Sequence, residues 1–326
     1  MKAAVRDRYG PPEVVAVRDV DRPVPKDDQV LVRMQAASVN RADLDLIYPK
    51  PGFARLFLGL RAPRDQRLGC DVAGIVEAVG PRATRFRQGD AVFADLYPFG
   101  LGAFAEFACA PEKAFLSIPL GITPEDAATL PHAAILAIQG LRWRGGRTVQ
   151  PGDKVLIDGA SGNVGPFAVQ IARHFGAEVT GVCSADKVDF VRALGADHVN
   201  DYETVDYTTT GERYDWILAV ESHHSILQCR RALRPKGVYV TLGGSTARIF
   251  QAMLVGPVIS IFTGKRMGLM LWWKPFKAED VATLTELIAA GKVTPIIDRR
   301  YPLAQVVDAL RYVDDGHAKG KVILTN

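Results

Sequence analysis

The sequence has few cysteines, and no two of them stand close together. Cys70, Cys109, Cys183 and Cys229 form no C-x-x-C pair, so a disulfide framework is not expected and reduced thiols of a cytosolic protein are the simplest interpretation. The N-terminal stretch MKAAVRDRYG contains no apolar segment of the kind found in secretory signals. We therefore expect a cytoplasmic protein.

A hydrophobic run long enough to span a bilayer is also lacking. The most lipophilic region is 249–273, and Pro257 and the GKR break at 264–266 divide it into pieces. Neither piece approaches the roughly 20 apolar residues of a membrane-spanning helix, so no transmembrane segment is expected. A buried helix with a pocket wall or subunit contact is favoured, and peripheral membrane contact through Trp272 and Trp273 stays open.

Internal repeats and blocks of like charge are absent. The 40 basic and 36 acidic residues are scattered and leave a net charge of +4, which gives no support to nucleic-acid binding. A hydrophobic content of 48% and a mean hydropathy of +0.05 indicate a globular protein with ample core. The length of 326 residues suits one large domain or two of ordinary size.

What the sequence does contain is a glycine-rich turn within 154–175. An apolar run at 155–157 precedes GASGNVG, and apolar residues then recur with helical spacing. This pattern predicts a buried strand, a tight turn and an amphipathic helix, which is how a dinucleotide-binding unit begins. Missing side chains let backbone N–H groups approach a pyrophosphate at the positive end of the helix. The turn residues predicted to bind a cofactor are Gly159, Ser161, Gly162, Asn163 and Val164.

A βα rhythm continues after this turn and is missing before it. Residues 1–122 show short β runs separated by glycine and proline turns, and Thr123 with Pro124 marks a helix start. Further on, strands are predicted at 178–183, from about Val199, at 214–220 and at 238–242, with helices at 133–141, 187–194, 226–233 and 279–290. We therefore predict an α/β protein in which a mostly antiparallel β domain precedes a parallel one.

A set of motifs, in order along the chain, resembles one known family. They are SVNRAD at 38–43, LGCDVAG at 68–74, FAEF at 104–107, the glycine turn, and GKVIL at 320–324. Together they are similar to the medium-chain dehydrogenase/reductase superfamily, and more narrowly to its zinc-independent quinone oxidoreductase branch, which includes the reticulon-interacting oxidoreductases. The resemblance implies a GroES-like catalytic domain at 1–122 and 278–326 and a Rossmann NADP-binding domain at 123–277.

The residues that hold catalytic zinc in many relatives are replaced here. The resemblance aligns Asn40 with a cysteine ligand, and Cys70 and Asp71 with a His-Glu pair. Catalytic zinc takes three protein ligands, usually including His, and adjacent strand residues point to opposite faces. The closely spaced cysteines of a structural zinc lobe are absent as well. We predict no metal and assign Cys70 to the core.

Asn40 and Tyr48 are the candidate catalytic residues. The resemblance places the Asn40 loop beside the nicotinamide ring, and Tyr48 lies on the segment that follows. An alternative stays open for Asn40 and Asp43, because such residues after a strand commonly bond to their own backbone in a turn. A threonine that faces the nicotinamide carboxamide in relatives is Leu136 here, so that hydrogen bond is missing.

The end of the second predicted strand favours NADPH as the cofactor. NAD-specific sites place a carboxylate there to bind the ribose 2′-OH, whereas this chain has Ser184 and Lys187. A hydroxyl and a cation suit a 2′-phosphate, although Lys187 as a solvated helix lysine stays open. Asp186 is expected to cap the next helix. By resemblance, Tyr202 packs at the adenosine phosphate and Gly243 approaches the nicotinamide.

The strand at 214–220 ends differently from its relatives, in AVESHH. Glu221 adds negative charge where a polyanionic cofactor is expected to pass. His223 and His224 suggest a metal or proton-transfer pair, but neighbours at a helix start do not share a face. Capping or solvent exposure is therefore favoured for both.

Two functions of different class fit these residues. The first is an NADPH-dependent, zinc-independent oxidoreductase that transfers a hydride to a small-molecule acceptor, namely a quinone, an α,β-unsaturated carbonyl or a related carbonyl. The second is a nucleotide-binding interaction protein that has lost turnover, for which Leu136, Ala219 and Glu221 give grounds. A homodimer is expected, because relatives pair through edge strands and the apolar segment 249–262 needs cover.

Overall fold

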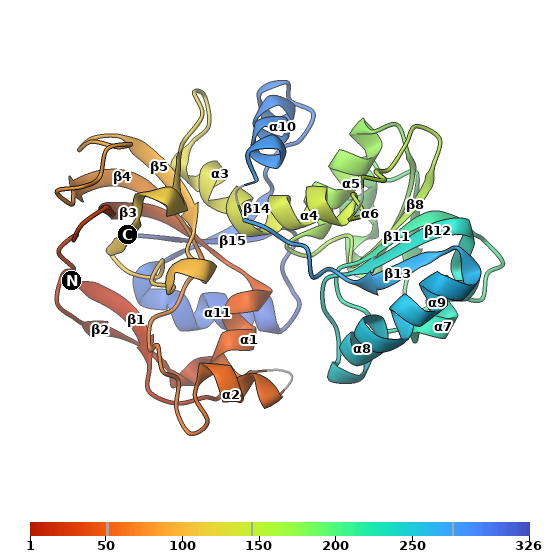
Figure 1. The fold of residues 1–326 in the computed structure, drawn as a ribbon, viewed down its shortest axis with the longest axis horizontal. Coiled ribbons are helices and arrows are strands. Elements are labelled where there is room, and N and C mark those ends of the chain that lie inside the picture. Colours follow the sequence, from red (N-terminus) through yellow and green to blue (C-terminus); the bar gives the residue numbers. More distant parts are fainter. Residues whose placement is uncertain (50–51, 145, 276) are drawn as a thin grey trace. The chain divides into compact units, whose positions relative to one another are not determined.

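The computed structural model describes residues 1–49, 52–144, 146–275 and 277–326 and divides the chain into two compact units. Unit 1 comprises Met1–His132 and Pro295–Asn326, and unit 2 comprises Ala133–Thr294 (Figure 1). The chain passes between the units later than the expected boundaries at 122/123 and 277/278.

Two helices account for this difference. α3 (Pro124–Thr129) starts at the predicted cap, where Thr123 Oγ1 accepts from the Asp126 N–H, and it packs on the sheet of unit 1. α10 (Ala278–Ala289) confirms the helix expected at 279–290, but it packs within unit 2. Its buried Asp280 accepts a hydrogen bond of 2.7 Å from Gln139. Each helix therefore belongs to the unit against which its buried face packs.

Unit 1 is built on a seven-stranded sheet with the order β14-β15-β3-β4-β5-β7, and β6 also pairs with β3. Its described pairings are antiparallel except that β14 runs parallel to β15, and β1 and β2 form a separate antiparallel pair. This confirms the mostly antiparallel domain. The strands are β1 Lys2–Arg6, β2 Val15–Asp19, β3 Gln29–Val39, β4 Asp71–Val79, β5 Ala91–Asp95, β6 Phe107–Pro111, β7 Phe115–Ser117, β14 Ile297–Pro302 and β15 Lys321–Thr325.

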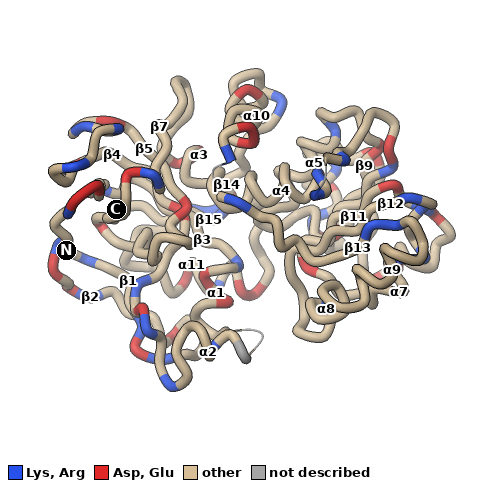
Figure 2. Tube along the Cα trace, viewed as in Figure 1, with Lys and Arg blue, Asp and Glu red and all other residues tan. Residues whose placement is uncertain are grey.

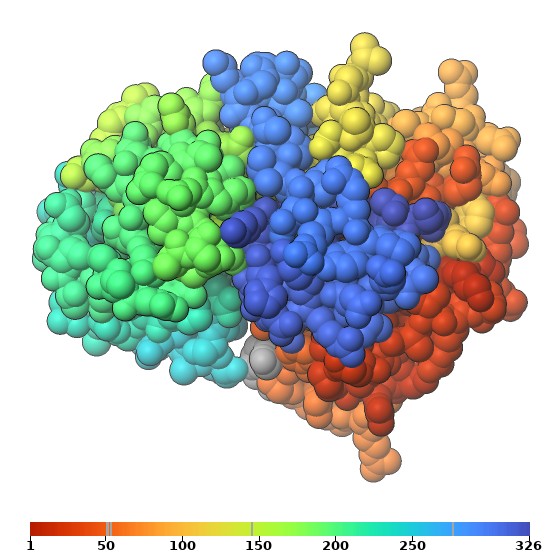
Figure 3. All heavy atoms as spheres, turned by 180° about the vertical axis from the view of Figure 1, so that it is seen from behind, coloured from red at the N-terminus to blue at the C-terminus, as the bar shows by residue number. Residues whose placement is uncertain are grey.

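β3 is the central strand of this unit, and its apolar side chains are almost completely buried. The C-terminal strand β15 pairs with it, so the two ends of the chain meet in one unit. Figure 3 shows the C-terminal segment, in blue, against the N-terminal residues, in red, where α11 contacts β2. The helices are α1 Arg41–Ile47, α2 Arg55–Leu58 and α11 Val306–Asp314, with 3-10 turns at Pro12–Val14, Gly52–Ala54, Tyr97–Phe99, Glu112–Ala114 and Leu303–Gln305.

Unit 2 contains a six-stranded parallel sheet with the order β10-β9-β8-β11-β12-β13. Numbered along the chain this is 3-2-1-4-5-6, the order of the Rossmann fold, in which ligands bind at the carboxyl ends of the strands. The strands are β8 Lys154–Asp158, β9 Glu178–Cys183, β10 His198–Asp201, β11 Tyr214–Ala219, β12 Leu233–Thr241 and β13 Arg266–Leu269. The helices are α4 Ile135–Gly140, α5 Gly165–His174, α6 Val188–Ala193, α7 Ile226–Ala232, α8 Thr246–Phe250, α9 Gly256–Thr263 and α10, with π turns at Leu130–Ala134 and Gln251–Val255.

The predicted elements of unit 2 agree with this list, apart from shifted ends and two local errors. Ser184, and not Asp186, is the N-cap after β9, because a 3-10 turn at Ala185–Lys187 precedes α6 and the Asp186 carboxylate accepts a bond from Ser184. Pro257 does not divide the lipophilic region. It lies in the first turn of α9, where a missing N–H is tolerated, and the π turn before it keeps the helix continuous.

Candidate functional site

The glycine turn joins β8 to α5 in the geometry that a dinucleotide site needs. Gly159 has a φ of 89°, a left-handed conformation that favours glycine. A Cβ on Gly165 would lie 2.2 Å from the carbonyl oxygen of Gly159, so this position is closed to any side chain. By contrast, a Cβ on Gly162 would meet nothing within 4 Å, which leaves its backbone open to an approaching ligand.

The polar side chains of the same turn fit a nicotinamide dinucleotide. Ser161 is buried, and the buried Oδ1 of Asn163 has no hydrogen-bond partner among the described residues. An unpaired buried acceptor at a helix N-terminus is suited to a ligand donor or a bound water. Gly159, Ser161, Gly162, Asn163 and Val164 therefore form one continuous cradle at the start of α5. Gly165, which closes it, was absent from the predicted site although its spacing signals it.

At the end of β9, three predicted residues lie close together with one acidic neighbour. Ser184 Oγ donates a 2.6 Å hydrogen bond to the exposed Asp186. Lys187 is 7% exposed, so the solvated-lysine alternative is wrong. The Tyr202 N–H donates to the Cys183 carbonyl, and its ring is exposed. The hydroxyl expected to bind a 2′-phosphate is thus already bonded to a carboxylate.

The ends of β11 and β12 hold a firmly bonded loop around Gly243. The Gly243 carbonyl accepts hydrogen bonds from the Ser222 N–H at 3.1 Å and from Thr241 Oγ1 at 2.8 Å. Ser222 is buried and its hydroxyl bonds Tyr239, whereas Glu221 is exposed. The backbone of this loop is therefore held in place at the ends of the strands, while the Glu221 side chain is exposed to solvent.

The two adjacent histidines point to different environments. His223 is exposed. His224 Nε2 lies 3.1 Å from an Asp206 oxygen, and its ring meets Tyr207 edge-on. His224 thus has a structural partner, and Ser225 is the N-cap of α7, so of the two alternatives solvent exposure describes His223 only.

A buried acid at the end of β8 was missed by the sequence analysis. Asp158 directly precedes Gly159, and the Tyr207 hydroxyl donates to its Oδ2 at 3.5 Å. Burial raises the pKa of Asp158 to about 7, opposed by the Tyr207 hydrogen bond and reinforced by Glu221. The available signal was an acid as the last residue of an apolar strand beside a glycine turn.

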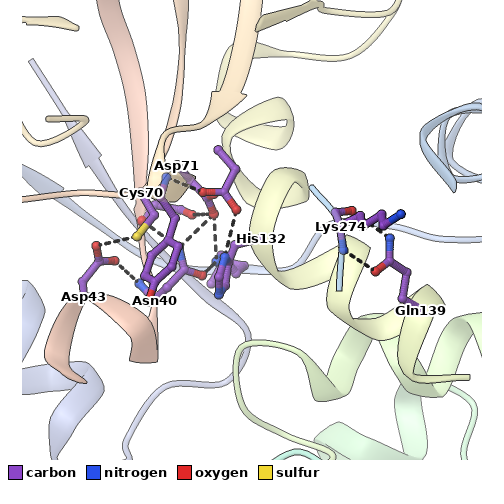
Figure 4. Close-up of polar contacts among 11 residues, drawn as sticks. Asn40, Asp43, Cys70, Asp71, His132, Gln139 and Lys274 are labelled. Carbon is purple, nitrogen blue, oxygen red and sulfur yellow. Dashed lines mark hydrogen bonds and ion pairs between the residues drawn. The ribbon is translucent and has the colours of Figure 1, made fainter. Parts of the chain in front are cut away.

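Unit 1 contains a polar cluster of its own, centred on Asn40 (Figure 4). The Asn40 N–H donates to Asp43 at 2.8 Å, which fixes the start of α1. Asn40 is 2% exposed, and both polar atoms of its side chain are hydrogen-bonded. Oδ1 accepts from Lys321 Nζ at 2.6 Å, and Nδ2 donates to Asp71 at 2.8 Å. The turn alternative thus describes Asp43 and also Asn40, whose Nδ2 donates to the Ser38 carbonyl at 3.3 Å. Asn40 in addition links three segments of the unit.

The buried ammonium of Lys321 is the positive charge of this cluster. It lies 3.7 Å from Asp71 Oδ2, and Ser38 Oγ donates to the same oxygen at 2.9 Å. Burial lowers the pKa of Lys321 and raises that of Asp71, and their mutual attraction opposes both shifts. By the resemblance, Asn40 and Asp71 stand where relatives place zinc ligands, and here a lysine reaches them.

The other members of the cluster are equally shielded. Cys70 is fully buried, which confirms its core assignment, and its thiol donates to Asp43 at 3.2 Å. Burial raises the pKa of Asp43 to about 6. His132 Nδ1 lies 2.9 Å from Asp95 Oδ2. Among the described residues, no three His, Cys, Asp or Glu side chains are grouped to hold a metal ion.

Tyr48 ends α1 and is directed toward α11. Burial raises the pKa of its hydroxyl, and a hydrogen bond to Asp314 adds to the shift. Arg41 Nη1 lies 3.3 Å from the same carboxylate. Tyr48 is therefore a neutral phenol held by an ion-paired acid.

Comparison with known proteins extends over nearly the whole chain. The alcohol dehydrogenase GroES-like domain model matches residues 26–120, and the zinc-binding dehydrogenase model matches residues 194–324. A chloroplast envelope quinone oxidoreductase homolog of Arabidopsis thaliana is 34% identical over 93% of this chain and 91% of its own length. The mitochondrial NAD(P)H oxidoreductase RTN4IP1 of Mus musculus is 31% identical over 99% of this chain and 89% of its own. The structure of a quinone oxidoreductase from Coxiella burnetii gives a TM-score of 0.85 at 27% identity, covering 100% of this chain and 99% of that one.

Replacing Lys321 should destabilise unit 1 strongly. Lys321→Met leaves the Asp71 carboxylate and the Asn40 oxygen buried without their cation, and we expect a loss of about 3–5 kcal/mol in the free energy of unfolding. Adding Asp71→Asn should recover part of it, because the orphaned charge is removed. Lys113→Met, at an exposed lysine of the same unit, should change stability by less than about 0.5 kcal/mol. Urea unfolding measures all four proteins, and equal losses at Lys321 and Lys113 would contradict the assignment.

Asp158→Asn should stabilise the protein at high pH and much less at low pH. The folded pKa lies above the unfolded one, so the folded state binds the proton more tightly, and stability falls as pH rises from about 4 to about 7. Above pH 7 the full cost of the buried carboxylate is present, and a shift from 3.8 to about 7 predicts a gain of about 4 kcal/mol. Urea unfolding at pH 8 and pH 5 tests this, with exposed Asp189→Asn as the control; a gain independent of pH would refute it.

Proposed function

Because the chain belongs to the quinone oxidoreductase branch of the medium-chain dehydrogenase/reductase superfamily and is an oxidoreductase with a nicotinamide cofactor, we propose that it uses NADPH to reduce a quinone, an α,β-unsaturated carbonyl or a related carbonyl without zinc. The observation that carries the zinc-free part is the Lys321 ammonium bonded to Asn40 beside Asp71. A lysine charge and a zinc ion are not expected to share these oxygens.

The chain's own residues bind and orient the reactants. When bound, a reduced nicotinamide supplies the hydride. The turn at 159–165 binds the pyrophosphate through open backbone N–H groups at the α5 N-terminus. The Gly243 loop, fixed by its two hydrogen bonds, supports the nicotinamide end. Positioning of this kind supplies a large part of the rate enhancement in hydride transfer.

The two candidate catalytic residues take different roles in this proposal. Burial and the hydrogen bond to Asp314 keep the Tyr48 hydroxyl protonated, and in this proposal its single proton turns from Asp314 to an acceptor oxygen when the substrate binds. The Asn40 carboxamide is occupied by Lys321 and Asp71, so Asn40 acts as a positioning residue for its loop. Without a metal, polarisation by a hydrogen bond or water suits conjugated acceptors better than simple alcohols.

The alternative is a nucleotide-binding interaction protein that has lost turnover. It is favoured by Leu136, which cannot bond a carboxamide, and by Glu221, which adds negative charge at the strand ends. The exposure of Glu221 weakens this argument, because an exposed charge is screened by solvent.

The deciding experiment follows NADPH oxidation against a panel of quinones, enones and aldehydes, with and without a chelator. We expect turnover with a conjugated acceptor that survives chelation. Gly162→Asp should abolish it by placing a carboxylate where a pyrophosphate is held, whereas Gly162→Ala, for which there is space, should retain most of it. NADPH binding without oxidation across the panel would favour the interaction protein, and activity lost on chelation would refute the zinc-free mechanism.

The preference for NADPH over NADH should respond to Asp186 and Lys187 in opposite directions. Asp186→Asn removes a carboxylate bonded to Ser184, so it should tighten NADPH by about tenfold with little effect on NADH. Lys187→Met should weaken NADPH by a similar factor, because a cation for the 2′-phosphate is lost. Calorimetric titration with both cofactors measures this, with Asp189→Asn as the matched control. Equal changes in affinity for NADPH and NADH would show that neither residue contacts the 2′-phosphate.

A further inference from the structure

One helix of unit 2 has two faces of unequal character. α8, the π turn Gln251–Val255 and α9 form a continuous helix, Thr246–Thr263. The face of this helix that is turned toward β13 is tightly packed. Ala252 and Ile259 are buried, and a Cβ on Gly256 would lie 2.6 Å from the Met267 carbonyl oxygen. Ser260 Oγ also accepts from the Met267 N–H at 2.9 Å. The helix is therefore firmly attached along β13.

The opposite face is apolar and open, which corrects the expectation of a buried helix. It carries Phe250, Met253, Leu254, Val255, Val258, Ile261 and Phe262, all exposed, with Ile261 at 76% and Phe262 at 81%. No charged residue occurs from 249 to 264. Within the described residues, this is the one helix long and apolar enough to cross a membrane, and 17% of its residues are buried. Because its inner face is bonded to β13, the helix is placed to lie along a surface.

The charge around this helix is of one sign. Residues 222–278 contain no Asp or Glu, although the rest of the chain mixes both signs. The same segment contains the basic residues Arg230, Arg231, Arg234, Lys236, Arg248, Lys265, Arg266, Lys274 and Lys277. In Figure 2, α9 is free of charged residues, and Lys and Arg lie in the elements beside it. Some of these cations have acidic partners from outside the segment, such as Asp215 for Arg234.

Three basic residues, Lys265, Arg230 and Arg213, lie near one another at the C-terminal end of α9. Lys265 Nζ donates to the Arg230 and Leu233 carbonyls at 2.7 and 2.8 Å, which ties the end of α9 to the end of α7. The pKa of Lys265 is lowered by burial and further by the charges of Arg230 and Arg213. Positive potential therefore borders the apolar face.

We propose that the exposed face of Thr246–Thr263 binds the surface of an anionic lipid bilayer, with its apolar side chains at the headgroup–acyl boundary and the neighbouring Lys and Arg on lipid phosphates. An amphipathic helix with an apolar face and basic flanks is suited to this position. The proposal is independent of the redox function.

A second copy of the chain is the competing occupant, since the sequence suggested that a homodimer covers this segment. A twofold interface brings the same patch against itself, so the acid-free surroundings of α9 would face each other with like charge. A lipid surface supplies the opposite charge and needs no matching donors. The homodimer remains a prediction for the edge strand β13, which pairs with β12.

The test is cosedimentation of the full chain with vesicles of phosphatidylcholine alone or of phosphatidylcholine with phosphatidylserine. We expect binding to the anionic vesicles at least about tenfold stronger than to the neutral ones, and weakened by salt. Ile261→Ser with Phe262→Ser should reduce it by about tenfold or more. Leu120→Ser, at a fully exposed leucine of unit 1, should leave it unchanged. Arg231→Gln, at an exposed arginine, should weaken anionic binding and leave neutral binding as it is.

Light scattering and urea unfolding of the same variants separate the outcomes. An unchanged urea unfolding midpoint in the Ser variants shows that unit 2 is folded, so their loss of vesicle binding supports the proposal. It is overturned if the wild-type chain binds neither vesicle, or binds both equally. It is also overturned if the Ser double variant converts a dimer into a monomer, which would assign the face to a second copy.

Discussion

The buried ammonium of Lys321 is the interaction on which the arrangement of unit 1 depends. β15 pairs with β3 in a register that sets Val322 opposite Val39, so the preceding residue of β15 reaches the loop that follows β3. There it satisfies the Asn40 carbonyl oxygen and faces the Asp71 carboxylate. Without a cation, these oxygens would be buried acceptors with no charge partner, which costs several kcal/mol of folding free energy. One charge thus holds together the start of α1, the start of β4 and the C-terminal strand.

In unit 2 the corresponding constraint is the parallel sheet. Its backbone groups bond to neighbouring strands, and its carboxyl edge gathers residues that are far apart in the chain: Asp158, Ser184 and Ser222 each follow or end a different strand. This edge combines open backbone at Gly162 with a buried acid one residue before the turn. A cofactor bound there meets the positive end of α5 and, behind it, a carboxyl group whose proton has a raised affinity.

On the outer surface of unit 2, charged and apolar side chains lie in separate areas. The inner face of Thr246–Thr263 is made of Ala252, Gly256 and Ile259, which allow close approach to β13. The larger apolar side chains, such as Ile261 and Phe262, lie on the opposite, exposed side. The result is an apolar strip bordered by cations, on a chain whose total charge is nearly balanced. Net charge alone therefore conceals this unequal surface.

The sequence by itself determined the class of fold, the family and the glycine turn. These are local matters, because strand, turn and helix periods and the left-handed Gly159 are specified within a few residues. It also determined the absence of the usual zinc ligands at Asn40 and Cys70. It misplaced the unit boundaries and the cap at Asp186, since both depend on which neighbours a segment meets. Only the tertiary structure decided that Lys321 reaches Asn40, that Lys187 is buried and that the helix through Pro257 is open on one side. Burial and pairing between distant residues are properties of packing, and no local pattern contains them.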